Sequence, residues 1–259
     1  MIPVVVGSSP ISHPKEFSKQ GHLLRHVAFF VFRKVLAMQI VGETLGRAEI
    51  EALLAQGPLS FHECTLDGAD LSRLDLRACA FSNCSIAETS FYAATLGQST
   101  WRRCRGRQAD FESADLTDAQ FHSCDLNNSN WRRARMASST LKGCKLTGAS
   151  FEEAAHLGLT FEDCLMNSAD LRRMSLRKAR LIGLDLADAD LGGCDFRDAV
   201  FEGGSLRGAN LKGARFDNAD LREADLGGVR LADAKLFQGA WITPRQAAEL
   251  VSELGLRVG

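Results

Sequence analysis

Large apolar residues recur at every fifth position over most of this chain. The series begins at Phe61 and ends at Trp241, and 35 of its 37 positions are large and apolar, Gly106 and His156 being the exceptions. A small residue usually stands two positions earlier, and all eight cysteines occupy that position. An α-helix buries a face about every 3.6 residues and a half-buried strand about every 2, so neither explains the period. The sequence therefore predicts a solenoid, in which every fifth residue points inward and neighbouring coils stack.

The composition restricts the classes of function. The chain carries 31 Lys and Arg against 32 Asp and Glu, whereas nucleic-acid-binding proteins usually carry a basic excess, so we expect no direct nucleic-acid binding. Eight cysteines without a CxxC pair and six scattered histidines give neither a disulfide scaffold nor a zinc signature. Arg33 and Lys34 divide the apolar stretch 27–41, which leaves less than the roughly 20 residues that span a bilayer. We expect a cytoplasmic, non-enzymatic protein without membrane contact, metal or cofactor.

The repeat has the consensus small–Asp/Asn–Leu/Phe–x–x, and it resembles the pentapeptide-repeat family over about residues 59–243. Ala-Asp-Leu, for example, stands at 69–71, 114–116, 169–171, 189–191, 219–221 and 224–226. The resemblance implies an all-β solenoid, a right-handed quadrilateral β-helix with four pentapeptides, or twenty residues, in each of about nine coils. The central Leu or Phe and the small residue two before it would point inward.

Residues twenty positions apart should then stack in columns. Six cysteines form one such column and aromatic residues form others; the cysteine column is Cys64, Cys84, Cys104, Cys124, Cys144 and Cys164. Stacked Cβ atoms about 4.8 Å apart exceed the roughly 3.5–4.5 Å of a disulfide. We interpret these cysteines as small core residues, with redox or metal chemistry as the alternative.

Arginine clusters at 102–107, 132–133 and 172–173 allow two interpretations. Across stacked coils, Glu112, Arg132, Glu152 and Arg172 would alternate in charge, as would Arg133, Glu153 and Arg173 beside them. This pattern favours an ion-pair ladder over a basic patch that binds a partner. The segment 102–107 lacks a ladder partner and is the better candidate for such a patch.

The two exceptions to the period predict local changes in the coil. Gly106 removes a core side chain, so a kink or bulge is expected there. His156 should hydrogen-bond a main-chain group, because an unpaired buried polar group costs about 1–3 kcal/mol. A catalytic role for His156 or the cysteines is the weakest of three hypotheses for the function.

The chain ends differ from the repeat. We divide the sequence into an N-terminal extension at 1–37, a cap at 38–58, the repeat at 59–242 and a helix and dimerisation tail at 243–259. The extension would be either a non-native upstream start or a lineage-specific, disordered segment. Residues 44–57 are compatible with a short helix or an irregular first coil. Thr243, Pro244 and Gln246 predict the start of a helix. Its apolar face would cover the open end of the solenoid or contact a second copy.

The C-terminal sequence from Gln246 to Gly259, Gln-Ala-Ala-x-Leu-Val-x-x-Leu-Gly-Leu-x-Val-Gly, resembles that of the Qnr and MfpA quinolone-resistance proteins. The resemblance implies a homodimer of end-to-end rods that mimics DNA, binds DNA gyrase or topoisomerase IV, inhibits the enzyme and relieves topoisomerase poisons. The unbroken register excludes the projecting loops of Qnr proteins, so inhibition is a firmer expectation than drug protection. The expected dimer interface is Trp241, Ala247, Leu250, Val251, Leu254, Leu256 and Val258.

A DNA mimic needs a negative surface in place of phosphates. Residues 182–259 contain thirteen acidic and nine basic residues. The expected topoisomerase-binding surface is Asp185, Asp188, Asp190, Asp195, Asp198, Glu202, Asp217, Asp220, Glu223 and Asp225. Two alternatives stay open: these are ordinary solvated faces of the repeat, or the solenoid is a scaffold for other protein–protein interactions without a topoisomerase role.

Overall fold

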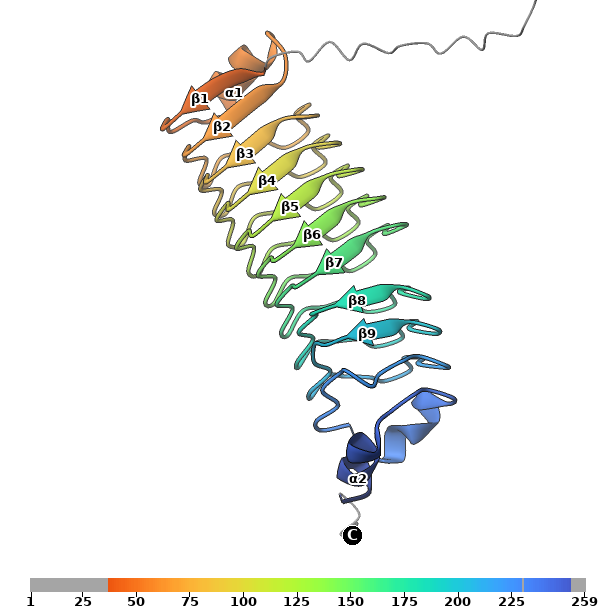
Figure 1. The fold of residues 1–259 in the computed structure, drawn as a ribbon. Coiled ribbons are helices and arrows are strands. Elements are labelled where there is room, and N and C mark those ends of the chain that lie inside the picture. The colour runs from red at the N-terminus through yellow and green to blue at the C-terminus, as the bar shows by residue number, and fades with distance from the viewer. Residues whose placement is uncertain (1–36, 230, 253–259) are drawn as a thin grey trace, which may run out of the picture. The chain divides into compact units, whose positions relative to one another are not determined.

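One parallel sheet of nine strands runs along the stacked coils (Figure 1). The computed structural model describes residues 37–229 and 231–252; for residues 231 and 232 it describes the main chain alone. The elements are β1 (Met38–Val41), α1 (Arg47–Leu54), β2 (Leu59–His62), β3 (Ala80–Ser82), β4 (Thr100–Arg102), β5 (Gln120–His122), β6 (Thr140–Lys142), β7 (Thr160–Glu162), β8 (Arg180–Ile182), β9 (Val200–Glu202), the 3-10 helix η1 (Leu231–Phe237) and α2 (Pro244–Ser252). The predicted all-β solenoid is confirmed, with a turn beginning at each of the eight strands β2–β9.

The register between coils is twenty residues, as the sequence predicts. Phe61 pairs with Phe81, and Phe81 pairs with Trp101. Bridges at the same interval link the other three sides of the coil. We name these sides by their central residues: wall 1 contains Phe61 and every twentieth residue after it, and walls 2, 3 and 4 begin in the same way at Leu66, Leu71 and Leu76.

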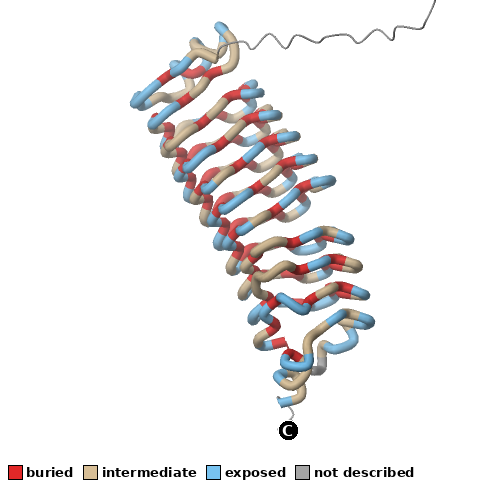
Figure 2. Tube along the Cα trace, viewed as in Figure 1, coloured by how far each residue is buried: buried red, intermediate tan, exposed pale blue. Residues whose placement is uncertain are grey.

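Aromatic side chains fill the core from walls 1 and 3. The rings of Phe81 and Trp101 stack on wall 1 with centroids 3.9 Å apart, and those of Phe111 and Trp131 stack on wall 3 at 4.3 Å. The two columns meet edge to face, for example at 5.9 Å between Trp101 and Phe111. Figure 2 shows the buried residues recurring along every coil. Eight of the 15 phenylalanines of the chain are central residues of walls 1 and 3, and Phe196 and Phe216 stack on wall 4 with centroids 4.8 Å apart.

The corners depend on a left-handed backbone conformation. Every non-glycine residue with a positive φ among the described residues has a number ending in 3 or 8, such as Arg103 at 51° and Asp188 at 56°. This conformation is energetically unfavourable for L-residues other than glycine. Hydrogen bonds to the next coil hold each corner in it; for example, Arg103 N–H donates to His122 C=O at 2.9 Å.

The expected kink at Gly106 is absent. Its N–H bonds Asp125 C=O at 2.7 Å, as in a regular coil. A Cβ atom at this position would lie 2.8 Å from Ile86 Cγ1 and 2.9 Å from Leu126 Cδ2. The side chains above and below therefore occupy the space of the missing residue, and the coil needs no distortion.

His156 does interrupt the seam between two coils. On wall 4 each coil normally receives a main-chain bond of the kind Ala155 N–H to Ala134 C=O, 2.9 Å. In the described part of the chain the next such bond, from Ser175 N–H to Ala154 C=O, is not formed, because the imidazole of His156 lies between these two groups. Nδ1 lies 2.9 Å from Ala154 O, and Ser175 N–H donates to Nε2 at 2.9 Å. The expected main-chain partner is confirmed, and the histidine is a wedge between coils.

Both ends of the solenoid depart from the regular coil. The first coil contains β1, which pairs with β2, followed by α1, so the open question about residues 44–57 is answered by a helix at 47–54. Regular coils extend to Val229 rather than to 242, because η1 includes the central positions of walls 3 and 4 in the last turn, Leu231 and Leu236. Within residues 231–252 no later coil accepts the main-chain bonds of this turn, and a 3-10 helix forms such bonds within itself.

Candidate functional site

Surface charge on the solenoid changes sign along its length and around its circumference. From residue 160 to 229, walls 1 and 2 carry eight acidic and three basic residues, whereas walls 3 and 4 carry five acidic and seven basic residues. From 60 to 159 the pattern reverses, with four acidic and six basic residues on walls 1 and 2 and eight acidic and five basic residues on walls 3 and 4. The excess of negative charge near the C-terminal end is therefore confined to two adjacent walls.

The ten predicted acidic residues do not form one surface. Walls 1 and 2 hold Asp185, Asp188, Glu202, Asp220, Glu223 and Asp225, and walls 3 and 4 hold Asp190, Asp195, Asp198 and Asp217. Sequence reasoning missed Glu162 and Asp163, which lie on wall 1 with the first group. Assigning each charge to its wall by the twenty-residue register would have found both.

Arginines neutralise most of these carboxylates. All four on walls 3 and 4 form ion pairs, as do Glu202, Asp220 and Asp225 on walls 1 and 2; the pairs are Asp190–Arg172, Asp195–Arg197, Asp198–Arg177, Asp217–Arg215, Glu202–Arg180, Asp220–Arg222 and Asp225–Arg207. Among the described residues, Asp185, Asp188 and Glu223 have no ion pair within 4.0 Å. The carboxylates that are free to attract a partner therefore lie on walls 1 and 2.

Many of the repeat's Asp side chains also have a structural role. At the position before the central residue, the carboxylate accepts a bond from the main-chain N–H two residues later, 3.1 Å from Ala187 N to Asp185 and 3.1 Å from Arg197 N to Asp195. The Arg197 guanidinium also donates to Asp195 at 2.8 and 2.6 Å. These bonds lower the pKa of Asp195 to about 2. The repeat's Asp thus stabilises the turn whether or not it contacts a partner.

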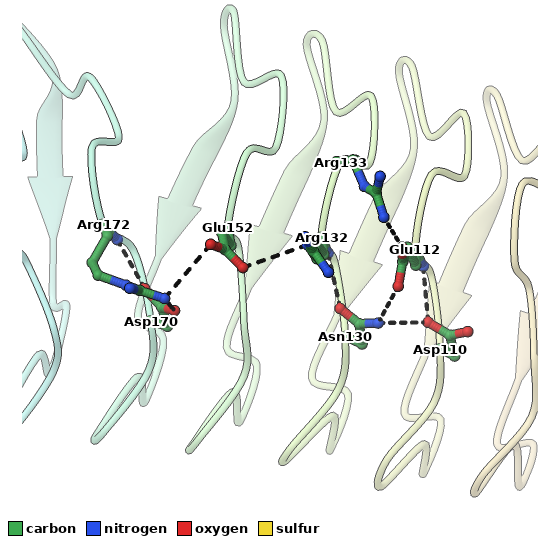
Figure 3. Close-up of polar contacts among 8 residues, drawn as sticks. All are labelled: Asp110, Glu112, Asn130, Arg132, Arg133, Glu152, Asp170 and Arg172. Atoms are coloured by element: carbon green, nitrogen blue, oxygen red, sulfur yellow. Dashed lines mark hydrogen bonds and ion pairs between the residues drawn. The ribbon is translucent and has the colours of Figure 1, made fainter.

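The predicted ion-pair ladder is present on wall 3, with one change. Glu152 lies between Arg132, at 3.4 Å, and Arg172, at 3.8 Å (Figure 3). Glu112 pairs diagonally with Arg133 instead of Arg132, and this contact holds the pKa of Glu112 below its usual range. Glu153 forms no ion pair among the described residues, so the second predicted column is not a ladder. Each exposed pair contributes about 0.2–1 kcal/mol.

At the C-terminal end, α2 lies against the last coil. The Gln246 side chain is buried, and its amide donates to Leu221 C=O and Ala224 C=O at 2.8 Å each. A pocket of about 270 Å³ lies between α2 and the last turn, lined by Leu226, Val229, Ala234, Phe237, Ala240, Ile242, Ala247, Leu250 and Val251. Three predicted interface residues, Ala247, Leu250 and Val251, thus face this pocket.

Trp241 is the most exposed of the predicted interface residues that the structure describes. Its exposed fraction is 64%, and the Arg222 guanidinium carbon lies 6.0 Å from its ring centroid. Leu254, Leu256 and Val258 lie outside the described residues. The helix therefore lies against the last coil, and the aromatic side chain of Trp241 stays exposed beside it.

The cysteines pack in the core. All eight are buried and free, and several Sγ–H groups donate to main-chain carbonyls, for example Cys194 to Leu171 at 3.0 Å. Burial raises the pKa of Cys194 to about 12 and also raises that of Cys79. The protonated, buried thiols of Cys79 and Cys194 are therefore neither nucleophiles nor good metal ligands. In the described part of the chain, no group of three His, Cys, Asp or Glu is placed to hold a metal ion, and no helix is long and apolar enough to cross a membrane.

Comparisons with known proteins agree with this architecture. A family model described as "Pentapeptide repeat region" matches residues 59–131 and 114–191, and one described as "Pentapeptide repeats (8 copies)" matches residues 194–233. The sequence matches none of the curated proteins with which it was compared.

Solved structures with a similar fold include QnrB1, a plasmid-mediated fluoroquinolone resistance protein. A trypsin-treated variant is 22% identical with a TM-score of 0.56, covering 86% of this chain and 98% of that chain. The full-length protein is 21% identical with a TM-score of 0.55, covering 85% and 98%. HetL, a pentapeptide repeat protein involved in heterocyst differentiation regulation in the cyanobacterium Nostoc, is 22% identical with a TM-score of 0.35, covering 72% and 86%. At these identities the similarity to QnrB1 establishes the fold.

Proposed function

The chain belongs to the pentapeptide-repeat family, and on that premise we propose that it binds a type II topoisomerase, DNA gyrase or topoisomerase IV, in place of duplex DNA. Members of this family generally act as binding scaffolds and not as enzymes. The observation that carries the proposal is the similarity to QnrB1 over 98% of that chain, without inserted loops in the coils from 59 to 229.

The charge distribution supports a specific binding surface for the enzyme. A protein surface that binds DNA is basic, so a mimic has to present carboxylates where DNA presents phosphates. Walls 1 and 2 beyond residue 160 meet this requirement, and Asp185, Asp188 and Glu223 on them form no ion pair with any residue that the structure describes. The carboxylates of walls 3 and 4 are neutralised by arginines, so we assign the topoisomerase surface to walls 1 and 2.

The proposal includes a homodimer joined through the C-terminal end. Two copies would place their acidic walls on either side of a twofold axis, which doubles the length of negative surface. Deleting residues 243–259 should give monomers in sedimentation, but it also removes Gln246, which attaches α2 to the last coil. Trp241→Asp is a cleaner test, because Trp241 is largely exposed and outside α2. A variant that sediments as a dimer would contradict this interface.

A gyrase supercoiling assay tests the proposal directly. Micromolar wild-type protein should inhibit supercoiling of relaxed plasmid, and the complete absence of inhibition would end the topoisomerase hypothesis. If the protein also reduces the inhibition of gyrase by a fluoroquinolone in the same assay, the proposal extends to protection of the enzyme from the drug.

Two matched triple variants then test which walls bind. The first, Asp185→Asn, Asp188→Asn and Glu223→Gln, should weaken inhibition about tenfold, because each exposed ionic contact contributes about 0.2–1 kcal/mol. The control, Asp195→Asn, Asp198→Asn and Asp217→Asn, changes the net charge equally on walls 3 and 4 and should leave inhibition unchanged. An equal loss in both would show that net charge, and not these walls, determines binding.

A further inference from the structure

The same short motif, Trp-Arg-Arg-small-Arg, occurs twice in the chain, and the two copies differ in whether their arginines form ion pairs. It stands at 101–105 and at 131–135. In the second copy each arginine has a carboxylate partner: Arg132 pairs with Glu152, Arg133 with Glu112 and Arg135 with Asp115. In the first copy, none of the guanidinium groups forms an ion pair or a side-chain hydrogen bond among the described residues, and neither does that of Arg107.

These four unpaired arginines are gathered at one corner of the solenoid, which we call the basic corner: Arg102, Arg103, Arg105 and Arg107. Arg102 and Arg103 lie on wall 1, and Arg105 and Arg107 on wall 2 of the same coil. All four side chains are exposed. Each guanidinium carries five N–H donors in a planar fork that matches a carboxylate.

A hollow in wall 1 adjoins the basic corner. It has a volume of about 520 Å³ and is lined by His62, Ser82, Asn83, Arg102, Arg103, His122 and Ser123. Pairing between strands places Arg102 next to Ser82 on one side and His122 on the other. The lining therefore offers hydrogen-bond donors and cationic groups over several adjacent coils, which suits an extended anionic chain.

We propose that the basic corner binds an Asp- and Glu-rich segment of a partner protein. A nucleic acid is the weaker fit, because the chain has a net charge of −1 and the corner is bordered by Glu88 and Asp125. Binding a nucleic-acid backbone depends on releasing many counterions to a strongly basic surface. A short acidic segment needs only a few carboxylates, each held by an arginine fork. The corner lies on the same two walls as the proposed topoisomerase surface, but at residues 102–107, whereas that surface begins beyond residue 160. The inference is therefore independent of topoisomerase binding.

The two copies of the motif provide a matched experiment. The test variant is Arg102→Ser, Arg103→Ser and Arg105→Ser, and the control is Arg132→Ser, Arg133→Ser and Arg135→Ser, so both remove three charges from the same sequence pattern. The probe is a fluorescein-labelled (Asp-Glu)₄ peptide, whose binding is followed by fluorescence anisotropy in low salt. A neutral (Asn-Gln)₄ peptide and an octamer of deoxythymidine are measured beside it, and circular dichroism checks that each variant is folded.

We expect the wild-type protein to bind the acidic peptide and not the neutral one, with an affinity that falls as salt is added. The test variant should bind about tenfold more weakly, since it loses three ionic contacts. The control variant should bind as the wild type does, although it loses three structural ion pairs. An equal loss in both variants, no binding by the wild type, or tighter binding of the oligonucleotide would each overturn the proposal.

Discussion

Replacing His156 with leucine should stabilise the solenoid. Leucine is the residue that the repeat requires at this position, and the neighbouring residues of the same column, Met136 and Leu176, are buried. In the native chain the imidazole instead lies between coils, where it accepts from Ser175 N–H and donates to Ala154 C=O. With leucine, the side chain can enter the core and Ser175 N–H can bond Ala154 C=O directly, as the other coils do.

The size of the effect follows from this exchange. The two hydrogen bonds to the imidazole are replaced by two main-chain bonds, which leaves that contribution nearly unchanged. One is the bond from Ser175 N–H to Ala154 C=O, and the other runs from the N–H of residue 156 to Ser175 C=O, as Met136 N–H bonds Ala155 C=O at 2.7 Å. Burying a leucine side chain is worth about 1.5–3 kcal/mol, and this is an upper estimate because the unfolded chain already buries part of its surface. For a chain of this length the melting temperature should rise by about 3–12 °C.

Thermal and urea unfolding of the wild type and His156→Leu measure the difference, and amide hydrogen exchange at Ser175 reports on the seam itself. Leu157→Ser is a control, because Leu157 is 86% exposed and a surface change of this kind alters the free energy of unfolding by less than about 0.5 kcal/mol. Unchanged or lower stability in His156→Leu, or unchanged exchange at Ser175, would refute the argument that the wedge keeps the two coils from closing.

Two further predictions concern the corners and the carboxylates. Gly204→Ala should lower the free energy of unfolding well beyond Gly203→Ala: both have φ near +80°, but only the Cβ of the first would meet a main-chain oxygen, Leu184 O at 2.2 Å. Similar urea midpoints would contradict this. NMR titration should find the Asp195 carboxyl with a pKa of about 2; since its unfolded value is about 3.9, its contribution to stability is complete above about pH 4 and is lost as the pH falls through 2. Arg197→Gln should raise that pKa, and a midpoint that does not move would refute the assignment of its cause.

Most of the fold could be predicted because it depends on one local rule. The period from Phe61 and the small residue before each central position specify the parallel stacking, the twenty-residue register and the buried cysteine column, and all three are confirmed. The rule describes only the interior of a coil that has neighbours on both sides. It therefore missed η1, where the period continues through Leu236 and Trp241 but no later coil follows.

The surface was less predictable for a related reason. The register shows which residues are neighbours, but long side chains choose between direct and diagonal partners, as Arg133 does with Glu112. Near Gly106 the neighbouring side chains filled the gap, which depends on packing that the sequence pattern does not contain. The ten candidate acidic residues were grouped by their distance along the sequence, and the structure separates them because consecutive pentapeptides face different directions.

The two Trp-Arg-Arg motifs begin thirty residues apart, one and a half turns of the solenoid, and so they lie on opposite walls. Gain or loss of a single five-residue unit would leave the interior almost unaltered and rotate everything downstream by a quarter of a revolution. In evolution, such an insertion or deletion could expose an existing group of charges to a new partner without inventing any of its residues.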